Sequence, residues 1–488
     1  MKVFRLTACL LAALLLLSSC GIVIINRGEE PGPATESETD FPPLTDSYES
    51  KDYPVVTEPD WVAEAEKWLG DLRSANFNGT TVFFLVAEGT GFTFDEEDDL
   101  YRAAVLKRNE LVNKKYNVQI ITERKNASTL LSEVKKADRA GDFYSDFVVI
   151  RSGDMSAYLE GGYLLNLKSL PYADYGAPYF DHKGMDQLTV GDAVYGAVGA
   201  ATAQIESYAC LYFNKSYAEE LGVSCPYKEV YDGTFTWDRF LDSLEDLPKG
   251  TTRFVSAFEE NKTAAMSYFS SGERFLTCYN LNQPRLSCDT KTAKTMISHV
   301  KKLFSLDTAK LTLEEQDGES EKTLKGFDIF KEGKALYALG SVADMESLQN
   351  AGFSWEVLPL PKLSEKKAFY TPMTADAPVI AALATSQRLE LMGHVLQAIN
   401  AASCDNMAYE FYKDAMQRLI TGTNTLDMLD FIRETPVYDL AFMLGEDVKA
   451  VRAGTYDALR DAAKGKQPFS YYLDSKKTAL NNYFSGLS

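Results

Sequence analysis

The sequence predicts an α/β protein with two lobes, and two observations carry that prediction. The chain has 488 residues, which is longer than one hydrophobic core usually serves. From residue 81 onward, short apolar runs of strand length alternate with longer runs of helix length. Strands and helices that alternate at this spacing form right-handed βαβ units around a parallel sheet.

The elements of the first predicted sheet follow one another as strand, helix and strand. Residues 81–87 form an apolar, β-branched and aromatic run, typical of a strand buried on both faces, and residues 118–122 and 147–150 form the next two strands. Helices are expected from about residue 98 to 115 and from residue 128 to 140. In the first helix acids come early and lysines late, as the helix dipole favours.

Ligands of an open α/β sheet bind beyond the carboxyl ends of its strands, which here are residues 88–92 and 151–154. Gly89 and Gly91 lie in the first of these loops. The third glycine of a dinucleotide fingerprint and the Gly-Lys-Ser/Thr of a P-loop are both missing from it. We therefore expect a tight loop that brings backbone close to a solute, rather than a nucleotide site.

The N-terminus has the pattern of an export signal. Lys2 and Arg5 supply a basic start, and residues 6–17 are a nearly unbroken apolar run that is too short for a stable membrane span. Leu-Ser-Ser-Cys at residues 17–20 resembles a bacterial lipobox, in which Cys20 becomes the lipidated first residue of the mature protein. The alternative is an ordinary secretory signal with a coincidental cysteine. Both readings place the rest of the chain outside the cytoplasm, and the lipobox places it on the outer face of a bacterial cell membrane.

A tether is expected after the signal, which ends at residue 20. Residues 28–60 are rich in Pro, Glu, Ser, Thr and Asp, and such a segment buries too little apolar surface to offset chain entropy. Residues 61–72 have apolar residues at helical spacing and predict a short helix. We expect residues 21–75 to be a disordered acidic tether with that helix in it, and the fold to begin at about Ala75.

Composition excludes several classes of partner. The formal net charge of -20 opposes binding to nucleic acid or to anionic membrane surfaces, because phosphate contacts need clustered Lys and Arg. Neutral or cationic ligands fit this charge better than strongly anionic ones. No later segment has the roughly 18 apolar residues of a spanning helix, so only the N-terminal lipid should touch the membrane.

Cysteine and histidine usage argues against disulfide frameworks and metal sites. Cys278 and Cys288 are near enough in sequence to close a loop, or else remain free or buried thiols. None of the three histidines, His182, His299 and His394, has the spacing of a metal-ligand motif. We expect no metal and no cofactor.

An ordered series of motifs carries a family resemblance. Each is weak alone, and together they occupy residues 146–150, 158–167, 195–198, 211–215, 218–222, 236–240 and 329–335. This series resembles the extracellular solute-binding proteins of carbohydrate-type ABC importers, the branch that includes maltose-binding protein, over most of the chain from about Thr81. Two departures stand out: Arg239 replaces a frequent acid, which leaves Thr236 and Asp238 to serve the helix N-terminus, and the loop after Ile150 lacks a Trp.

The resemblance implies a two-lobed periplasmic-binding-protein-like fold, each lobe a mainly parallel sheet flanked by helices. The first lobe would comprise residues 76–203 plus 357–400, and the second residues 207–355 plus 405–488. The chain would cross between lobes near residues 203–207, 355–359 and 400–405. The lobes would close around a solute, expected to be an oligosaccharide, and deliver it to the permease subunits of an ABC importer. We expect a monomer with no catalytic residues.

Motif positions also give candidate ligand-binding residues. Sugars are held by aromatic faces together with carboxylates, amides and hydroxyls. In the first lobe the candidates are Glu88, Thr90, Phe92, Arg151, Ser152, Asp154 and Tyr195, with residues 370–373 returning to it. In the second lobe they are Glu206, Tyr208, Tyr268, Phe269, Ser341 and Asp344. Of these, Tyr268 and Asp154 are expected to contact the solute from opposite lobes.

Each candidate has a structural alternative. Phe92 and Phe269 could be core residues, and the three acids Glu88, Asp154 and Asp344 could be solvated or could cap helices. Tyr208 could hydrogen-bond across the connection between lobes. We expect Trp237 to pack at a helix start and Trp355 to pack where the lobes join.

Rival functions also remain at this point. Paired carboxylates in a sugar cleft would suit a glycoside hydrolase. A bilobed surface lipoprotein could instead bind a peptide or polyamine, or act as a sensor or adhesin.

Overall fold

The computed structural model describes residues 61–90, 92, 99–202, 205–277, 285–286, 288, 290–306, 312–317, 320–419, 424–445, 448–465 and 467–486. Cys20 and the predicted tether up to residue 60 lie outside the described residues. So does Cys278, and with it the question of a bridge to Cys288, which is buried. Within the described ranges, none of the helices combines the length and the apolar character needed to cross a bilayer.

The first sheet has the strand order β15-β3-β1-β2. Strand β1 (Thr80–Ala87) is parallel to β2 (Val118–Lys125) and to β3 (Phe147–Arg151), with Thr80 opposite Val118 and Phe84 opposite Phe147. Strand β15 (Pro378–Ala382) returns from far along the chain and pairs antiparallel with β3. The three strands predicted for this part of the chain, and their parallel pairing, are confirmed.

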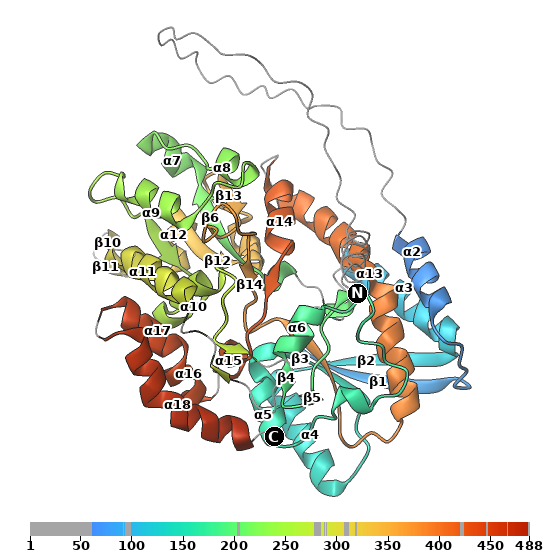
Figure 1. The fold of residues 1–488 in the computed structure, drawn as a ribbon. Helices are drawn as coiled ribbons and strands as arrows, with labels where there is room; N and C mark the ends of the chain where they lie inside the picture. The colour runs from blue at the N-terminus through green and yellow to red at the C-terminus, as the bar shows by residue number, and fades with distance from the viewer. Residues whose placement is uncertain are drawn as a thin grey trace, which may run out of the picture. The chain divides into compact units, whose positions relative to one another are not determined.

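Helices surround this sheet (Figure 1). The two predicted here are confirmed as α3 (Asp99–Tyr116) and α4 (Ala127–Ala140), and α4 is capped by Asn126 and ended by Gly141 with φ 67°. Helix α13 (Leu389–Leu419) packs against α3. Smaller elements of this lobe are α5 (Met155–Glu160), α6 (His182–Gln187), β4 (Thr189–Val190) and β5 (Ala193–Val194).

Helix α2 (Trp61–Asp71) corrects the predicted start of the fold. The expected helix forms, but it is not part of a tether. Trp61, Ala65 and Leu69 recur at every fourth residue and are buried, and α2 packs against α13. The folded body therefore includes α2 and begins before Ala75, because this apolar stripe has a partner.

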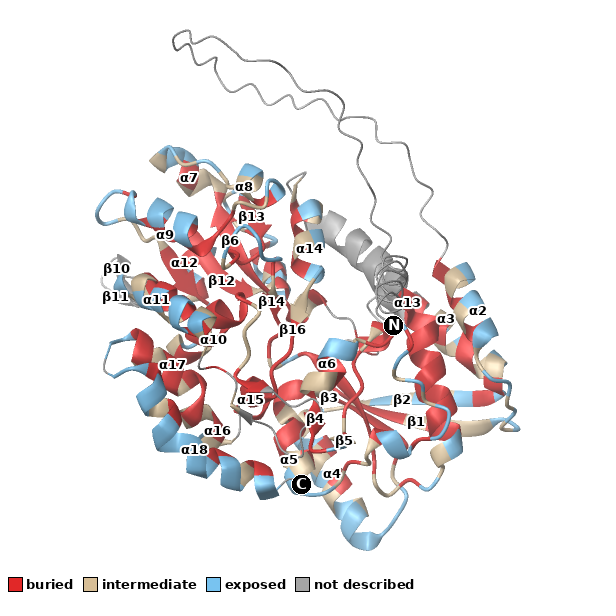
Figure 2. Ribbon diagram, in the orientation of Figure 1, coloured by how far each residue is buried: buried red, intermediate tan, exposed pale blue. Residues whose placement is uncertain are grey.

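The second sheet has the order β13-β6-β12-β7 and differs from the mainly parallel sheet expected for it. Strand β6 (Ala209–Asn214) is antiparallel to both β12 (Tyr337–Ser341) and β13 (Trp355–Leu358), while β7 (Phe254–Ser256) is parallel to β12. The reason is the path of the chain: β6 leaves the first lobe, and the other three strands run back toward it. Figure 2 shows β6 and β12 buried inside the lobe.

Helices cover the second sheet. Before its last strand come α7 (Lys215–Leu221), α8 (Tyr227–Tyr231), α9 (Trp237–Glu245), α10 (Glu260–Phe269), α11 (Lys291–Ser305) and α12 (Phe327–Lys331). The C-terminal helices are α14 (Thr425–Arg433), α15 (Leu440–Leu444), α16 (Lys449–Gly454), α17 (Tyr456–Ala463) and α18 (Phe469–Gly486). Two small hairpins pair β8 (Leu276–Thr277) with β9 (Arg285–Leu286), and β10 (Thr312–Asp317) with β11 (Ser320–Lys325). Helix α17 packs on α10 and α11, and α14 packs on β13.

Three segments lie side by side between the two sheets, and we call residues 205–208, 371–374 and 435–438 the connecting ribbon. Strands β14 (Thr371–Pro372) and β16 (Pro436–Val437) are parallel, and Tyr208 pairs with Met373. The Thr374 amide donates to the Ser207 carbonyl at 2.8 Å, and the Met373 amide to the Val437 carbonyl at 3.0 Å.

One of the predicted lobe connections lies elsewhere. Residues 355–358 form β13, a paired strand of the second sheet. The chain therefore leaves the second sheet later, through residues 371–374 of the connecting ribbon. Near residues 400–405 the helical run of α13 is interrupted: Cys404 has non-helical φ 28° and ψ 160°, so two helices meet there at a kink. Residues 205–207 lie where the first connection is expected.

Candidate functional site

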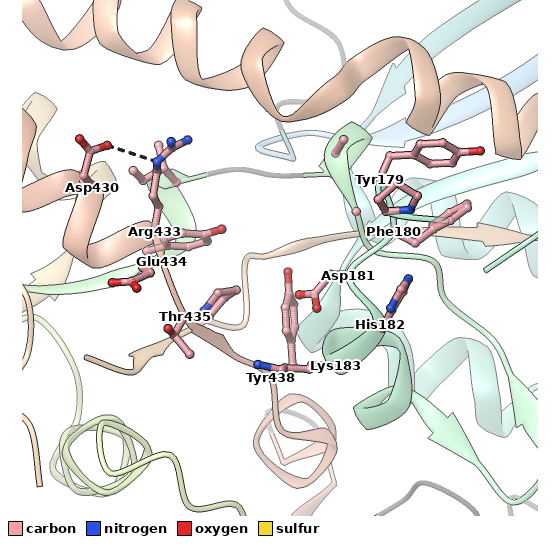
Figure 3. A pocket seen from close by; sticks show the side chains of 16 residues that line it. Tyr179, Phe180, Asp181, His182, Lys183, Asp430, Arg433, Glu434, Thr435 and Tyr438 are labelled. Atoms are coloured by element: carbon pink, nitrogen blue, oxygen red, sulfur yellow. Dashed lines mark ion pairs between the residues drawn. The ribbon is translucent and has the colours of Figure 1, made fainter. Parts of the chain in front are cut away.

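A cavity of about 710 Å³ opens between two groups of residues that are far apart in sequence. One wall is formed by residues 178–183 with Gly199 and Ala200, the other by the end of α14 and β16. Ile205 and Tyr208 of the connecting ribbon also line it. Figure 3 shows Tyr179 to His182 on one side, Asp430 to Thr435 on the other, and Tyr438 between them.

Asp181 organises the first wall. Its Oδ1 accepts a hydrogen bond from the Gly184 amide at 2.9 Å, so the side chain caps the short helix α6. A Cβ on Gly184 would come within 2.9 Å of both Asp181 Oδ2 and the Tyr438 ring. Glycine at this position therefore lets the ring of Tyr438 pack against the first turn of α6.

Tyr179 is fixed in the same wall by contacts on several sides. Its carbonyl accepts from the Ala200 amide at 2.9 Å, and its hydroxyl accepts from the Gln397 side-chain amide on α13. Its ring centroid lies 5.5 Å from that of Phe180. The wall thus presents aromatic surface that the neighbouring elements hold in place.

The opposite wall is polar. Asp430 and Arg433 form an ion pair at 3.3 Å near the end of α14, and Glu434 is exposed beside them. The other end of α14 is attached to β13, because the Thr425 hydroxyl donates to the Glu356 carboxylate at 2.7 Å. Burial raises the pKa of Glu356 above its ordinary value.

Two tyrosines of the connecting ribbon line the cavity between the walls. Tyr208 and Tyr438 are both buried, with 8% and 5% of their surface exposed. Burial raises the pKa of Tyr438 well above its ordinary value, and the neighbouring Tyr208 and Asp181 raise it further. Tyr438 therefore keeps its hydroxyl proton at physiological pH and can donate a hydrogen bond.

The lining can hold a polar, largely uncharged molecule. Four aromatic rings offer faces or edges to C–H groups, namely those of Tyr179, Phe180, Tyr208 and Tyr438. The three acids of the described lining, Asp181, Asp430 and Glu434, are nearly balanced by Lys183 and Arg433. In the described part of the chain, no group of three or more His, Cys, Asp or Glu side chains is placed to hold a metal ion.

Of the thirteen predicted ligand-binding residues, Tyr208 alone appears among the described residues that line this cavity. Arg151 and Asp154 pair with each other at 2.8 Å, and Arg151 also meets Asp376 at 3.5 Å. The hydroxyl of Ser152 donates to the Ala375 carbonyl at 3.0 Å. This cluster therefore joins the end of β3 to the segment that follows the connecting ribbon.

The loop after β1 turns into the core. Phe92 is 2% exposed and stacks on Phe84 with ring centroids 5.3 Å apart, under the Arg108 guanidinium. The Thr90 hydroxyl donates to the Ala87 carbonyl at 2.7 Å, so it caps the strand end. Glu88 is exposed. The core alternative for Phe92 is the one that the structure supports.

Tyr268 and Phe269 were predicted to bind the solute, but in the structure both lie in the core. Tyr268 has no exposed surface, and Phe275 stacks on its ring at 5.2 Å between centroids with 8° between planes. Phe269 is 1% exposed and packs against Phe275 and Phe442. Because α10 is covered by α11 and α17, neither ring offers a face to a solute in this structure.

Other predicted residues take structural roles. Ser341 and Asp344 form a capping box, in which the Asp344 carboxylate accepts from the Ser341 amide at 2.7 Å. The capping alternative for Asp344 is therefore correct. Trp237 is buried at the start of α9 and donates to the Ser270 hydroxyl at 2.8 Å, as expected of a packing residue. Tyr195, Glu206 and Tyr370 are half-buried, and Trp355 is buried in β13.

The motif positions miss both walls of the cavity. Residues 178–183 carry one usable signal, an aromatic pair followed by an aspartate that caps a helix. Residues 430–438 show only a helix end that runs into Pro436. Neither pattern indicates that the two segments lie on facing walls of one cavity.

Comparison with known proteins places the chain in a family. Residues 110–388, more than half of the chain, match the family of bacterial extracellular solute-binding proteins, so the chain belongs to that family. The family consists of binding proteins, and this chain is a binding protein rather than an enzyme. The resemblance predicted from the motifs is confirmed at this level. No curated protein matches the chain.

Solved structures share the fold at low identity. An ABC substrate-binding protein from Listeria monocytogenes in complex with cycloalternan is 13% identical, with a TM-score of 0.50 over 83% of this chain and 99% of that one. A cyclo/maltodextrin-binding protein complexed with maltotetraose is 15% identical, with a TM-score of 0.53 over 83% of this chain and 98% of that one. The chain thus has the two-lobed α/β fold of periplasmic binding proteins.

Proposed function

We propose that this protein captures an oligosaccharide in the cavity beside the connecting ribbon and delivers it to an ABC importer. The observation that carries the proposal is the cavity lining, which combines aromatic rings with carboxylates and hydroxyls from two walls. Support comes from the two structural neighbours, which are described in complex with cycloalternan and with maltotetraose, both carbohydrates.

The chemistry of the lining suits a sugar. Rings such as Phe180 and Tyr208 pack against the C–H faces of a pyranose, while Asp181 and Thr435 accept or donate hydrogen bonds to its hydroxyls. The near balance of acids and bases leaves no strong field of one sign for a polyamine or a polyphosphate. A cavity of about 710 Å³ also falls in the range of small-molecule sites.

A thermal-shift screen tests the proposal. The panel would contain maltotetraose, cycloalternan and other oligosaccharides, together with short peptides and spermidine. We expect at least one oligosaccharide to raise the melting temperature, and Tyr208→Ala to weaken that response. If only peptides or the polyamine stabilise the protein, the carbohydrate assignment is wrong and the binding role remains.

We further propose that Cys20 carries the lipid that anchors the protein to the outer face of the cell membrane, where importer permease subunits would receive the solute. The support is the sequence pattern at residues 1–20 together with the extracellular family. Metabolic labelling with a palmitate analogue tests this step. Label should enter the wild-type protein and not Cys20→Ser; equal labelling of the two would refute the anchor.

A further inference from the structure

Helix α2 reaches the wall of the cavity through one side chain. The ring of Trp68 meets the ring of Tyr179 edge to face, with 5.8 Å between centroids and 79° between planes. Tyr179 is a lining residue of the cavity. Aromatic pairs of this geometry contribute beyond the area that they bury. The N-terminal helix is therefore in contact with the site, although Trp68 itself does not line it.

Contacts at both ends of α2 and along its length fix the helix to the first lobe. Near its start, the Cys404 thiol meets the Trp61 carbonyl at 3.6 Å, at the kink of α13. Just after its end, the Lys115 ammonium donates to the Leu72 carbonyl at 2.9 Å. Between these points the buried stripe of α2 packs on α13 (Figure 1). Trp68 thus projects from a helix fixed at both ends.

Besides Trp68, two side chains among the described residues contact the Tyr179 side chain, those of Gln397 and Phe180. Gln397 of α13 binds its hydroxyl and, with its own Oε1, accepts from the Asp174 amide at 2.8 Å. The ring then has Phe180 on one side and Trp68 on another. Loss of Trp68 would free one side of the ring, and Phe180 and Asp181 follow it directly in the chain.

We propose that Trp68 is a positioning residue of the binding site, which holds Tyr179 and the wall after it in place. This inference rests on the proposed function in taking the cavity as the solute site. It assigns α2 to the frame of that site, and it means that removing the chain up to residue 72 would weaken solute binding without removing any lining residue.

Amide hydrogen exchange on the full chain tests the proposal without any ligand. The Asp181 amide donates to the Val198 carbonyl at 3.0 Å and the Met185 amide to the Asp181 carbonyl at 2.9 Å, so exchange at these positions measures opening of the wall. We expect about two- to tenfold faster exchange over residues 179–185 in Trp68→Ala, the range that the energy of one aromatic pair implies. Trp68→Phe, which keeps an aromatic ring, should restore most of the protection. Leu131→Ala on α4 is a control for general loss of packing in the same lobe and should leave these amides unchanged.

Calorimetry with maltotetraose as the probe separates this inference from the proposed function. If wild-type protein binds maltotetraose, Trp68→Ala should bind about two- to tenfold more weakly and Trp68→Phe nearly as wild type. Equal affinity in Trp68→Ala would overturn the positioning role and leave the sugar site intact. If no oligosaccharide binds, faster exchange in Trp68→Ala still supports the positioning role, and unchanged exchange overturns it.

Discussion

The hydroxyl of Tyr268 is buried, and no described group forms a hydrogen bond with it. A buried polar group without a partner costs about 1–3 kcal/mol of stability. Tyr212 provides the contrast, because its hydroxyl donates to the Ser341 carbonyl at 2.6 Å. The two tyrosines are both buried in the second lobe, and they differ in whether the hydroxyl is satisfied.

We expect Tyr268→Phe to stabilise the protein by about 1 kcal/mol, since it removes an unsatisfied hydroxyl and keeps the ring. Tyr212→Phe should destabilise it by about 1 kcal/mol, because the Ser341 carbonyl loses its donor. Denaturant unfolding of both variants and the wild type measures the difference. Solute binding by Tyr268→Phe should match the wild type, since the ring lies in the core. Destabilisation of both variants alike would show that Tyr268 has a partner.

At this scale the sequence could not separate core tyrosines from site tyrosines. Tyr208 and Tyr268 both sit in apolar stretches and carry the same side chain. The first lines the cavity because the connecting ribbon passes beside it, and the second is covered by Phe275. That difference depends on which distant segment covers each ring, and no local pattern records it.

Among the elements, those with a long or strongly apolar local pattern could be predicted. Strands β1 to β3 were recoverable from apolar runs of strand length, and helices α3 and α4 from the longer runs between them, with the charge order of α3 as further support. Strand β13 was taken for a connection, since four residues carry too little periodicity to show sheet pairing. Helix α6 was missed for the same reason, because it has only six residues.

Helix α14, which carries one wall of the cavity, is tied to β13 through a buried acid. Glu356 is 1% exposed and accepts from the Thr425 hydroxyl at the first turn of α14. Burial is the largest cause of its raised pKa, which the hydrogen bond and Lys215 partly oppose. A carboxyl of this kind binds its proton more tightly in the folded protein than in the unfolded chain. Its contribution to stability is full below its unfolded pKa and is lost as pH rises through the folded pKa.

The side chain introduced by Glu356→Gln cannot ionise. We therefore expect the stability of this variant, relative to that of the wild type, to be highest at neutral pH. As pH falls toward about 4.5, the wild type recovers the contribution of its protonated carboxyl and gains on the variant. Melting temperatures of the two proteins, measured side by side from pH 7 to pH 4.5, give the difference. Glu365→Gln, the same substitution at an exposed position, is the matched control for exchanging a carboxyl for an amide. A difference that does not change with pH would mean that Glu356 is ionised as readily in the folded protein as in the unfolded chain.

The two-lobed fold could be predicted for the whole molecule from motif order and strand alternation, while the cavity could not. Its walls, residues 178–183 and 430–438, are far apart in sequence, and the second wall includes the last segment of the connecting ribbon. They meet because β14 and β16 align the two later segments of the ribbon beside Tyr208. The site is therefore a product of how the chain passes between its sheets.

This arrangement predicts a change in shape when a solute binds. A molecule that contacts both walls favours the conformation in which they are closest, so binding should draw the lobes together about the connecting ribbon. We expect the radius of gyration from small-angle scattering to fall when wild-type protein is saturated with a sugar that raises its melting temperature. The radius of gyration of Tyr208→Ala should fall less at the same sugar concentration, because a smaller fraction of this variant is bound. At higher sugar concentration it should reach the value of the saturated wild type. An unchanged radius of gyration at full occupancy would show that the two walls already lie at their bound separation, and that this protein binds its solute without closure.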